Sequence, residues 1–169
     1  AKRSPHLEGF AENGIDVLLL TDPIDEFWVS MVPNFSDKPL TSISREKVDL
    51  SEFSESAQTP ESKASEETYS DLVQKTKDIL GEAVSDIRMS STLTSSPARL
   101  VAGEGGLDFN LERILKAQNP DYQGTAKVLE LNPSHPLIEK MNAALETNAD
   151  VVADTAQILL QQARILDSE

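Results

Sequence analysis

The stretch SEFSESAQTPESKASEE, at residues 51–67, most constrains how this chain can fold. It holds five Ser, five Glu and a single Lys, and Phe53 is its only large apolar residue. A segment so poor in apolar side chains buries too little surface to offset the entropy lost on ordering it. We therefore predict an acidic, Ser- and Glu-rich linker at residues 40–67, with folded parts at residues 1–39 and 68–169.

The overall composition limits the possible classes of function. The chain has 169 residues, with 29 Asp and Glu against 15 Lys and Arg, and a formal net charge of −14. Because binding to nucleic acid needs clustered Lys and Arg, no nucleic-acid partner is expected. The longest wholly apolar run, VLLL at residues 17–20, is too short to span a membrane, and no signal-peptide pattern opens the sequence. The lack of cysteine excludes disulfides and suits a cytoplasmic protein.

Residues 1–39 alternate between helix and strand patterns in the way that is typical of an α/β domain. A short helix is predicted at residues 7–13, ending at Gly14. The run IDVLLL at residues 15–20 follows, and its apolar, partly β-branched side chains predict a buried strand. We interpret this part as a short α/β tail of another domain.

A second short helix is predicted between Asp22 and about Met31, because Asp22 can cap a helix with Pro23 at its first position. The acids Asp22, Asp25 and Glu26 follow the predicted strand, which leaves open a weak metal or phosphoryl-transfer site. Capping and solvated turns explain these acids more simply. With two His and no Cys in the chain, no zinc site is expected. No spacing singles out a nucleophile and its base, so no catalytic residue is assigned.

The part at residues 68–169 predicts an α+β fold, with helices packed on a small sheet of about three strands. Apolar residues at helical spacing indicate a first helix that ends at Gly81. SDIRMSSTL (residues 85–93) and ARLVA (98–102) predict a hairpin whose connection is TSSP. KVLELN (127–132) supplies a third strand, which the hairpin needs because two strands alone are marginally stable in water.

Two further helices are predicted near the end of the chain. They are PLIEKMNAALE (residues 136–146) and ADVVADTAQILLQQARIL (149–166), and Asp150 is expected to cap the second. The apolar stripe of the second helix is wide enough to pack against more than one neighbour. This helix is therefore expected to contact both its own domain and something else.

The stretch GGLDFNLERILKAQNP, at residues 105–120, predicts an amphipathic helix that follows a glycine-rich loop. Its apolar stripe consists of Leu107, Leu111, Ile114 and Leu115. Most such stripes face a core. Here the flexible loop, together with Phe109 on the polar face, favours instead a stripe that is exposed and contacts another protein. The two interpretations are about equally supported. Both interpretations stay open on the residues alone.

Four segments carry a resemblance to a known family. They are SPHLEGFAENGIDVLLLTDPIDEFWV, VSDIRMSSTLTSSPARLV, NLERILKAQ and LELNPSHPLIEKM, in this order along the chain. Together they resemble the ninety-kilodalton heat-shock chaperones, called HtpG in bacteria, over nearly the whole chain. The resemblance implies that residues 1–39 are the C-terminal tail of the family's middle domain. It also implies that residues 68–169 form the C-terminal dimerisation and client-contact domain.

The resemblance implies the function of a molecular chaperone. Such a fragment is expected to bind unfolded or partly folded client proteins and to contribute to the homodimer of an ATP-dependent heat-shock chaperone in the cytoplasm. ATP and Mg²⁺ bind the family's N-terminal domain, so no cofactor or metal ion and no ATP hydrolysis are expected of this fragment, although the parent protein is expected to be an ATPase. The client-binding residues implied by position are Phe27, Trp28, Met31, Leu107, Phe109, Leu111, Ile114 and Leu115.

The family's C-terminal domains dimerise through a four-helix bundle with two helices from each protomer. Residues 150–166 resemble the first of these helices. The dimer-contact residues implied there are Val152, Thr155, Ile158, Leu159, Gln162, Ile165 and Leu166. The second helix would follow Glu169, so we expect a fragment whose homodimer is weakened or lost. The alternative left open is an acidic scaffold module that dimerises without binding clients.

Overall fold

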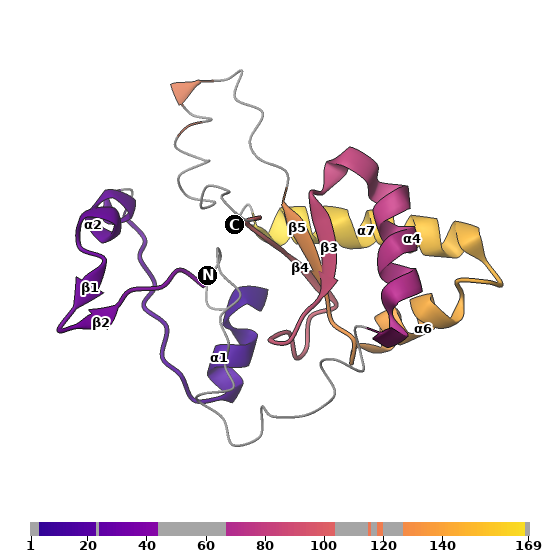
Figure 1. Cartoon of the computed structure of the whole chain (residues 1–169), viewed down its shortest axis with the longest axis horizontal. Coiled ribbons are helices and arrows are strands. Elements are labelled where there is room, and N and C mark those ends of the chain that lie inside the picture. Colours follow the sequence, from indigo (N-terminus) through magenta and orange to yellow (C-terminus); the bar gives the residue numbers. More distant parts are fainter. Residues whose placement is uncertain are drawn as a thin grey trace.

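The computed structural model describes residues 4–22, 24–43, 67–103, 115, 118, 119 and 127–167. A short N-terminal group of elements comes first, followed by a layer of helices on a sheet (Figure 1). The first group consists of η1 (Pro5–Leu7), α1 (Glu8–Glu12), α2 (Asp25–Met31), β1 (Asn34–Phe35) and β2 (Lys38–Pro39). The second consists of α4 (Ser70–Leu80), η3 (Gly81–Ala83), β3 (Asp86–Met89), β4 (Ala98–Val101), β5 (Val128–Leu131), α6 (Pro136–Ala143) and α7 (Ala149–Asp167).

The main sheet has the strand order β3-β5-β4, so the predicted hairpin of β3 and β4 is wrong. β5 lies between them, parallel to β3 and antiparallel to β4. All four residues of β5 are buried, which a central strand with covered faces allows and an exposed edge would not. The predicted α+β class with a three-stranded sheet is confirmed, with the last strand at its centre.

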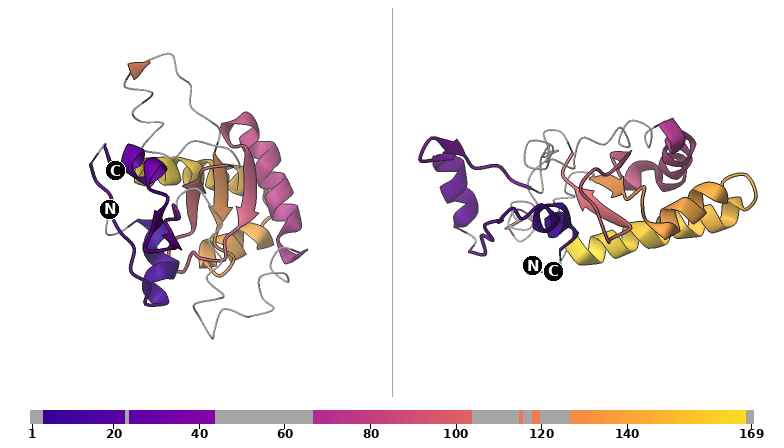
Figure 2. Two further views of the ribbon diagram at one scale, coloured as in Figure 1. Left: turned by 60° about the vertical axis from the view of Figure 1, so that its left-hand side comes forward. Right: turned by 90° about the horizontal axis from the view of Figure 1, so that it is seen from below.

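The hydrophobic core lies between one face of this sheet and the helices. The strand register places Ile87, Leu129 and Leu100 side by side on that face. α4 contacts β3 and α7 contacts β4, while α6 packs on α7. Figure 2 shows α7, in yellow, lying against one side of the sheet and extending beyond it. The helices contribute Leu72, Leu80, Ile138, Met141, Val152, Leu159 and Leu160 to this core.

The predicted helices of this layer are confirmed, with one change at a cap. α4 ends at Gly81, whose φ of 51° suits a glycine. The Nδ1 atom of His135 accepts the N–H of Leu137 at 3.1 Å, which caps α6. Asp150, however, lies inside the first turn of α7. The Oδ1 atom of Asn148 accepts the N–H of Val151 at 3.3 Å instead, so the cap lies two residues earlier than predicted.

The predicted buried strand at residues 15–20 is wrong. These residues form no strand, and Leu18, Leu19 and Leu20 are 77%, 44% and 45% exposed. A strand needs a hydrogen-bonded neighbour. Among the strands that the structure describes, β1 and β2 pair with each other, and β3, β5 and β4 form the other sheet. The preceding helix ends at Gly14, with φ of 66°, as predicted.

α2 and a two-residue hairpin follow this extended segment. Asp22 accepts the N–H of Ile24 through Oδ1 at 3.1 Å, and its own N–H donates to Oδ2 of Asp25 at 2.9 Å. These bonds lie in the turn before α2, which begins at Asp25, two residues after the first helical position predicted at Pro23. β1 and β2 then pair across Ser36 and Asp37, which both have positive φ, as a type I′ turn requires. The domain limits at residues 39 and 67 stay predictions, since most of the predicted linker lies outside the described residues.

Candidate functional site

The apolar side chains of α2 and of the residue before it face solvent. Ile24, Phe27, Trp28 and Met31 follow the spacing i, i+3, i+4 and i+7, so they share one face of the helix. Their exposed fractions are 63%, 51%, 46% and 81%. We call these four residues the α2 surface. It stands away from the sheet, beyond α1 (Figure 1).

The chain after α2 extends this apolar surface. Val32 is 38% exposed and Phe35, on β1, is 67% exposed. An apolar stripe at helical spacing usually marks the face that packs on a core, but here it is the exposed face. Burial of apolar area has no preferred direction, so such a surface can accept ligands of varied sequence. Contiguous exposed apolar residues are typical of sites that bind other proteins.

The predicted client-contacting helix lies almost wholly outside the described residues. This holds for Leu107, Phe109, Leu111 and Ile114, whose roles stay predictions. Leu115 is described and half-buried, and its carbonyl oxygen accepts the N–H of Asn119 at 2.8 Å, which is a helical bond. Of the eight predicted client-binding residues, the structure therefore brings together Phe27, Trp28 and Met31.

The residues predicted for the dimer contact divide between two faces of α7. Val152 and Leu159 are 0% and 1% exposed and lie in this chain's own core, so they do not form an accessible surface. Thr155 is half-buried. The outer face carries Ile158 and Ile165, which are 63% and 62% exposed. An open hollow on this face is lined by Gln157, Ile158, Gln161, Gln162, Ile165 and Leu166.

A buried ionic cluster crosses the sheet on the face opposite the hydrophobic core. Glu130 of β5 pairs in register with Arg88 of β3 and Arg99 of β4. The Nη2 atom of Arg88 lies 2.7 Å from Oε1 of Glu130, and the Nη2 atom of Arg99 lies 2.6 Å from Oε2 of the same carboxylate. Two residues of the loop at residues 90–97, between β3 and β4, add hydrogen bonds. Arg99 donates to the hydroxyl of Thr92 at 2.7 Å, and the hydroxyl of Ser90 donates to Glu130 at 3.3 Å.

The two arginines keep Glu130 ionised. Burial raises the pKa of this carboxyl, but the charges of Arg99 and Arg88 and their hydrogen bonds outweigh burial and lower the pKa below its ordinary value. No sequence pattern predicted this cluster. Its one signal was the Glu within the otherwise apolar run VLEL, which becomes informative only once the strand neighbours are known.

Asp22 and Asp25 make local hydrogen bonds in the turn before α2, which agrees with the simpler interpretation of capping and solvated turns. Within residues 4–43, 67–103 and 127–167, no group of three or more His, Asp or Glu is arranged to hold a metal ion. In the same part of the chain, no helix has the length and apolar character needed to cross a membrane.

An α+β layer with exposed apolar surfaces on two helices is typical of proteins that bind other proteins. The model of the Hsp90 protein family matches residues 1–169, so the chain belongs to the Hsp90 family. The chaperone protein HtpG of Paramagnetospirillum magneticum is 42% identical over 173 residues, which cover 99% of this chain and 28% of that protein. The chaperone protein HtpG of Mycobacterium leprae is 43% identical over 162 residues, covering 92% of this chain and 25% of that protein.

These comparisons confirm the resemblance that the four sequence segments indicated. The chain spans about a quarter of the length of the curated relatives it matches. Properties of the whole relatives, such as their substrates and assembly, therefore concern this chain only as proposals.

Proposed function

We propose that this chain is part of a heat-shock chaperone and that its α2 surface binds unfolded or partly folded client proteins. The observation that carries the proposal is the exposure of Ile24, Phe27, Trp28 and Met31, on the one face of α2 where an ordinary helix would bury them. Family membership and relatives named as chaperone proteins support the same function.

The physical properties of the surface suit this ligand class. Unfolded proteins expose apolar side chains in many sequences, and burial of apolar area tolerates that variety. Met31 adds a flexible and polarisable side chain, which adapts to irregular partners. The net charge of −14 keeps a protein with exposed apolar patches in solution through self-repulsion. The lack of cysteine suits a cytoplasmic setting, which we propose for the parent protein.

We further propose that the parent protein is a homodimer and an ATPase. The exposed isoleucines of α7 supply an apolar face for a second copy, while Val152 and Leu159 hold α7 on its own sheet. ATP and Mg²⁺ are assigned to a part of the parent that this chain does not include. The four predicted residues Leu107, Phe109, Leu111 and Ile114 belong to the proposed client surface through the family resemblance.

An aggregation assay tests client binding. The chain is added to a denatured protein, and light scattering records how far aggregation is suppressed. The double variant Phe27→Ser, Met31→Ser should lose most of the suppression. Ile158→Ser, Ile165→Ser is the matched control, because these side chains are exposed to a similar degree on another helix. Equal losses in both variants would show non-specific adhesion and would exclude a site at α2.

The second candidate function is an acidic scaffold module that self-associates without binding clients. It is favoured by the open apolar hollow around Ile158 and Ile165. Sedimentation velocity at several concentrations separates the two functions. A dimer that forms with rising concentration, dissociates in the Ile158→Ser, Ile165→Ser variant and shows no client affinity would favour the scaffold. Suppression of aggregation by a monomer favours the chaperone fragment.

A further inference from the structure

The side chain of Glu8 joins two segments that lie far apart in the sequence. Glu8 is the first residue of α1, and its Oε2 accepts the backbone N–H groups of Thr94, Ser95 and Ser96 at 3.1, 3.0 and 3.0 Å. Its Oε1 accepts the hydroxyl of Ser96 at 2.5 Å. Consecutive backbone N–H groups that converge on one oxygen form a nest, which is an arrangement that binds anions.

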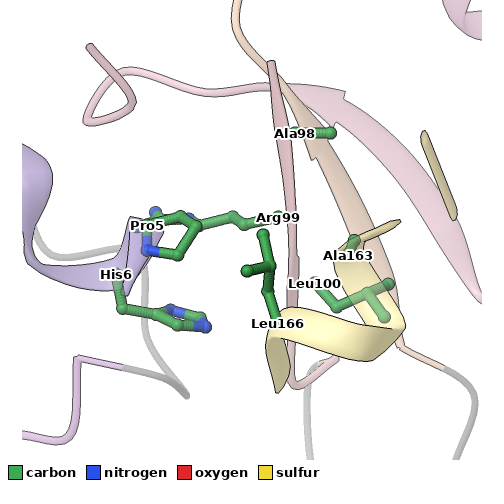
Figure 3. A pocket seen from close by; sticks show the side chains of 7 residues that line it. All are labelled: Pro5, His6, Ala98, Arg99, Leu100, Ala163 and Leu166. Carbon is green, nitrogen blue, oxygen red and sulfur yellow. The ribbon is translucent and has the colours of Figure 1, made fainter. Parts of the chain in front are cut away.

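The neighbouring residues bring the same two segments together. Pro5 and His6 of η1 line a small cavity with Arg99 of β4 and Leu166 of α7, and Figure 3 shows Arg99 extending toward Pro5. This cavity has a volume of only about 10 Å³, room for about one water molecule, so the contact is close. Pro5 is buried, and η1 contacts β4.

The loop that holds Glu8 is itself fixed to the sheet. This β3–β4 loop spans residues 90–97. The Nδ2 atom of Asn132 donates to the carbonyl oxygen of Ser96 at 3.0 Å, and the N–H of Asn132 donates to Pro97 at 2.9 Å. At the other end, Arg99 donates to Thr92, and Ser90 donates to Glu130 of the ionic cluster. A carboxylate bound by residues 94–96 is therefore held in a fixed position relative to the sheet.

Residues 15–20, which follow α1, are held less firmly than the β3–β4 loop. Residues 15–20 form no strand, and the side chains of Leu18, Leu19 and Leu20 are exposed. This extended segment connects α1 to α2. Among the described residues, those at 4–14 connect the N-terminal group to the sheet through the contacts above, and Glu8 supplies four hydrogen bonds to them.

We propose that residues 94–96 form an intramolecular carboxylate-binding site, and that Glu8 bound there is a latch that fixes residues 4–14 to the sheet. With the latch closed, α1 and the sheet move as one body. With the latch open, residues 4–14 reorient relative to the β3–β4 loop and the sheet. The latch depends only on these contacts and not on the proposed client binding.

Hydrogen exchange followed by NMR tests the site. In Glu8→Ala, the amides of Thr94, Ser95 and Ser96 should exchange about tenfold faster or more, because each loses a hydrogen bond to a charged acceptor. Glu12→Gln is the matched control, since Glu12 is exposed on the same helix and should leave these amides unchanged. The amides of Leu129 and Leu131 report whether the sheet remains folded. Unchanged exchange at residues 94–96 would exclude Glu8 as the bound group.

Distance measurement between two spin labels tests the latch. The chain has no cysteine, so labels attach only to introduced ones. A pair at Ala11 of α1 and Lys140 of α6 should give one narrow distance distribution, which broadens in Glu8→Ala. The pair Lys75 and Lys140, on two helices of the sheet layer, should stay narrow in both proteins. Faster exchange at residues 94–96 with an unchanged Ala11–Lys140 distribution would overturn the latch.

Ser96→Ala keeps the proposal testable if Glu8→Ala unfolds the sheet. This variant removes one of the four hydrogen bonds and leaves the backbone N–H groups in place. It should broaden the Ala11–Lys140 distribution to a smaller extent, with the amides of Leu129 and Leu131 still protected. A distribution identical to that of the parent chain would contradict the proposal.

Discussion

The guanidinium of Arg99 lies 2.6 Å from the carboxylate of Glu130, and the side chains are 9% and 5% exposed. The two residues face each other in register across β4 and β5. Because Arg88 pairs with the same carboxylate from β3, one buried acid links all three strands. The sheet is thus held together by side chains on the face opposite the hydrophobic core as well.

Loss of the Glu130 carboxylate should destabilise the protein strongly. Glu130→Ala leaves Arg99 buried without its partner, and breaking a buried ion pair in this way costs about 3–5 kcal/mol. Asp86→Asn is the control, since it removes the exposed ion pair between Asp86 of β3 and Lys77 of α4. Such an exposed pair contributes at most about 1 kcal/mol to stability. Urea denaturation gives both free energies of unfolding. Similar losses in the two variants would show that the cluster is not buried in solution.

Glu8 should make part of the stability depend on pH. Burial raises the pKa of its carboxyl, but the hydrogen bonds from Ser96, Ser95 and Thr94 outweigh burial and lower the pKa from 4.5 to about 2. A carboxyl whose pKa is lower in the folded state than in the unfolded state stabilises the folded protein. This stabilisation is complete at pH values above the pKa of the unfolded state. That contribution declines as the pH falls from about 4.5 toward 2.

The difference between the parent chain and Glu8→Gln isolates this contribution. The parent chain should be more stable at pH 6, and the difference should shrink as the pH falls below about 4.5. Denaturation curves at pH 6, 5, 4 and 3 measure it. Glu130 titrates in both proteins, so it cancels in the comparison. A difference that stays constant down to pH 3 would contradict the bonding described for Glu8.

The two apolar runs that each predicted a strand should differ in how much stability they lose on truncation. Leu129→Ala removes a fully buried side chain from the centre of the sheet and should cost about 2–5 kcal/mol. Leu18→Ala alters a side chain that is 77% exposed and should change the stability by about 0.5 kcal/mol or less. Thermal or urea denaturation compares them. A large loss in Leu18→Ala would mean that residues 15–20 are buried.

The helices were predictable because their signal is local. Leu72, Thr76 and Leu80 recur at helical spacing and are all buried on α4, and Gly81 and Gly14 end their helices as predicted. The cap of α7 was misplaced by two residues because both Asp150 and Asn148 are residue types that cap helices.

The strand order was not predictable in the same way, since pairing joins residues far apart in the chain. KVLELN shows an apolar run, but nothing in it states whether the strand is central or at an edge. The run IDVLLL has an even stronger strand pattern, yet residues 15–20 form no strand, because pattern alone supplies no neighbour.

The residues of the candidate site could be predicted from the sequence, but their exposure to solvent could not. Phe27, Trp28 and Met31 were identified through the family resemblance, and their helical spacing is visible in the sequence. Their exposure is not, because an apolar stripe looks the same whether it faces a core or solvent. Glu8 and Ser96 are 88 residues apart, so no local pattern links them.

The emission of Trp28 tests the account most directly, because it is the only Trp in the chain and lies on the α2 surface at 46% exposure. The measurement adds a denatured client that lacks Trp and carries an extrinsic label, so that label anisotropy reports binding while Trp emission reports the site. We predict that emission shifts to shorter wavelength as the client binds, and that Phe27→Ser, Met31→Ser weakens both changes together. A rise in label anisotropy with unmoved Trp28 emission would contradict client binding at α2.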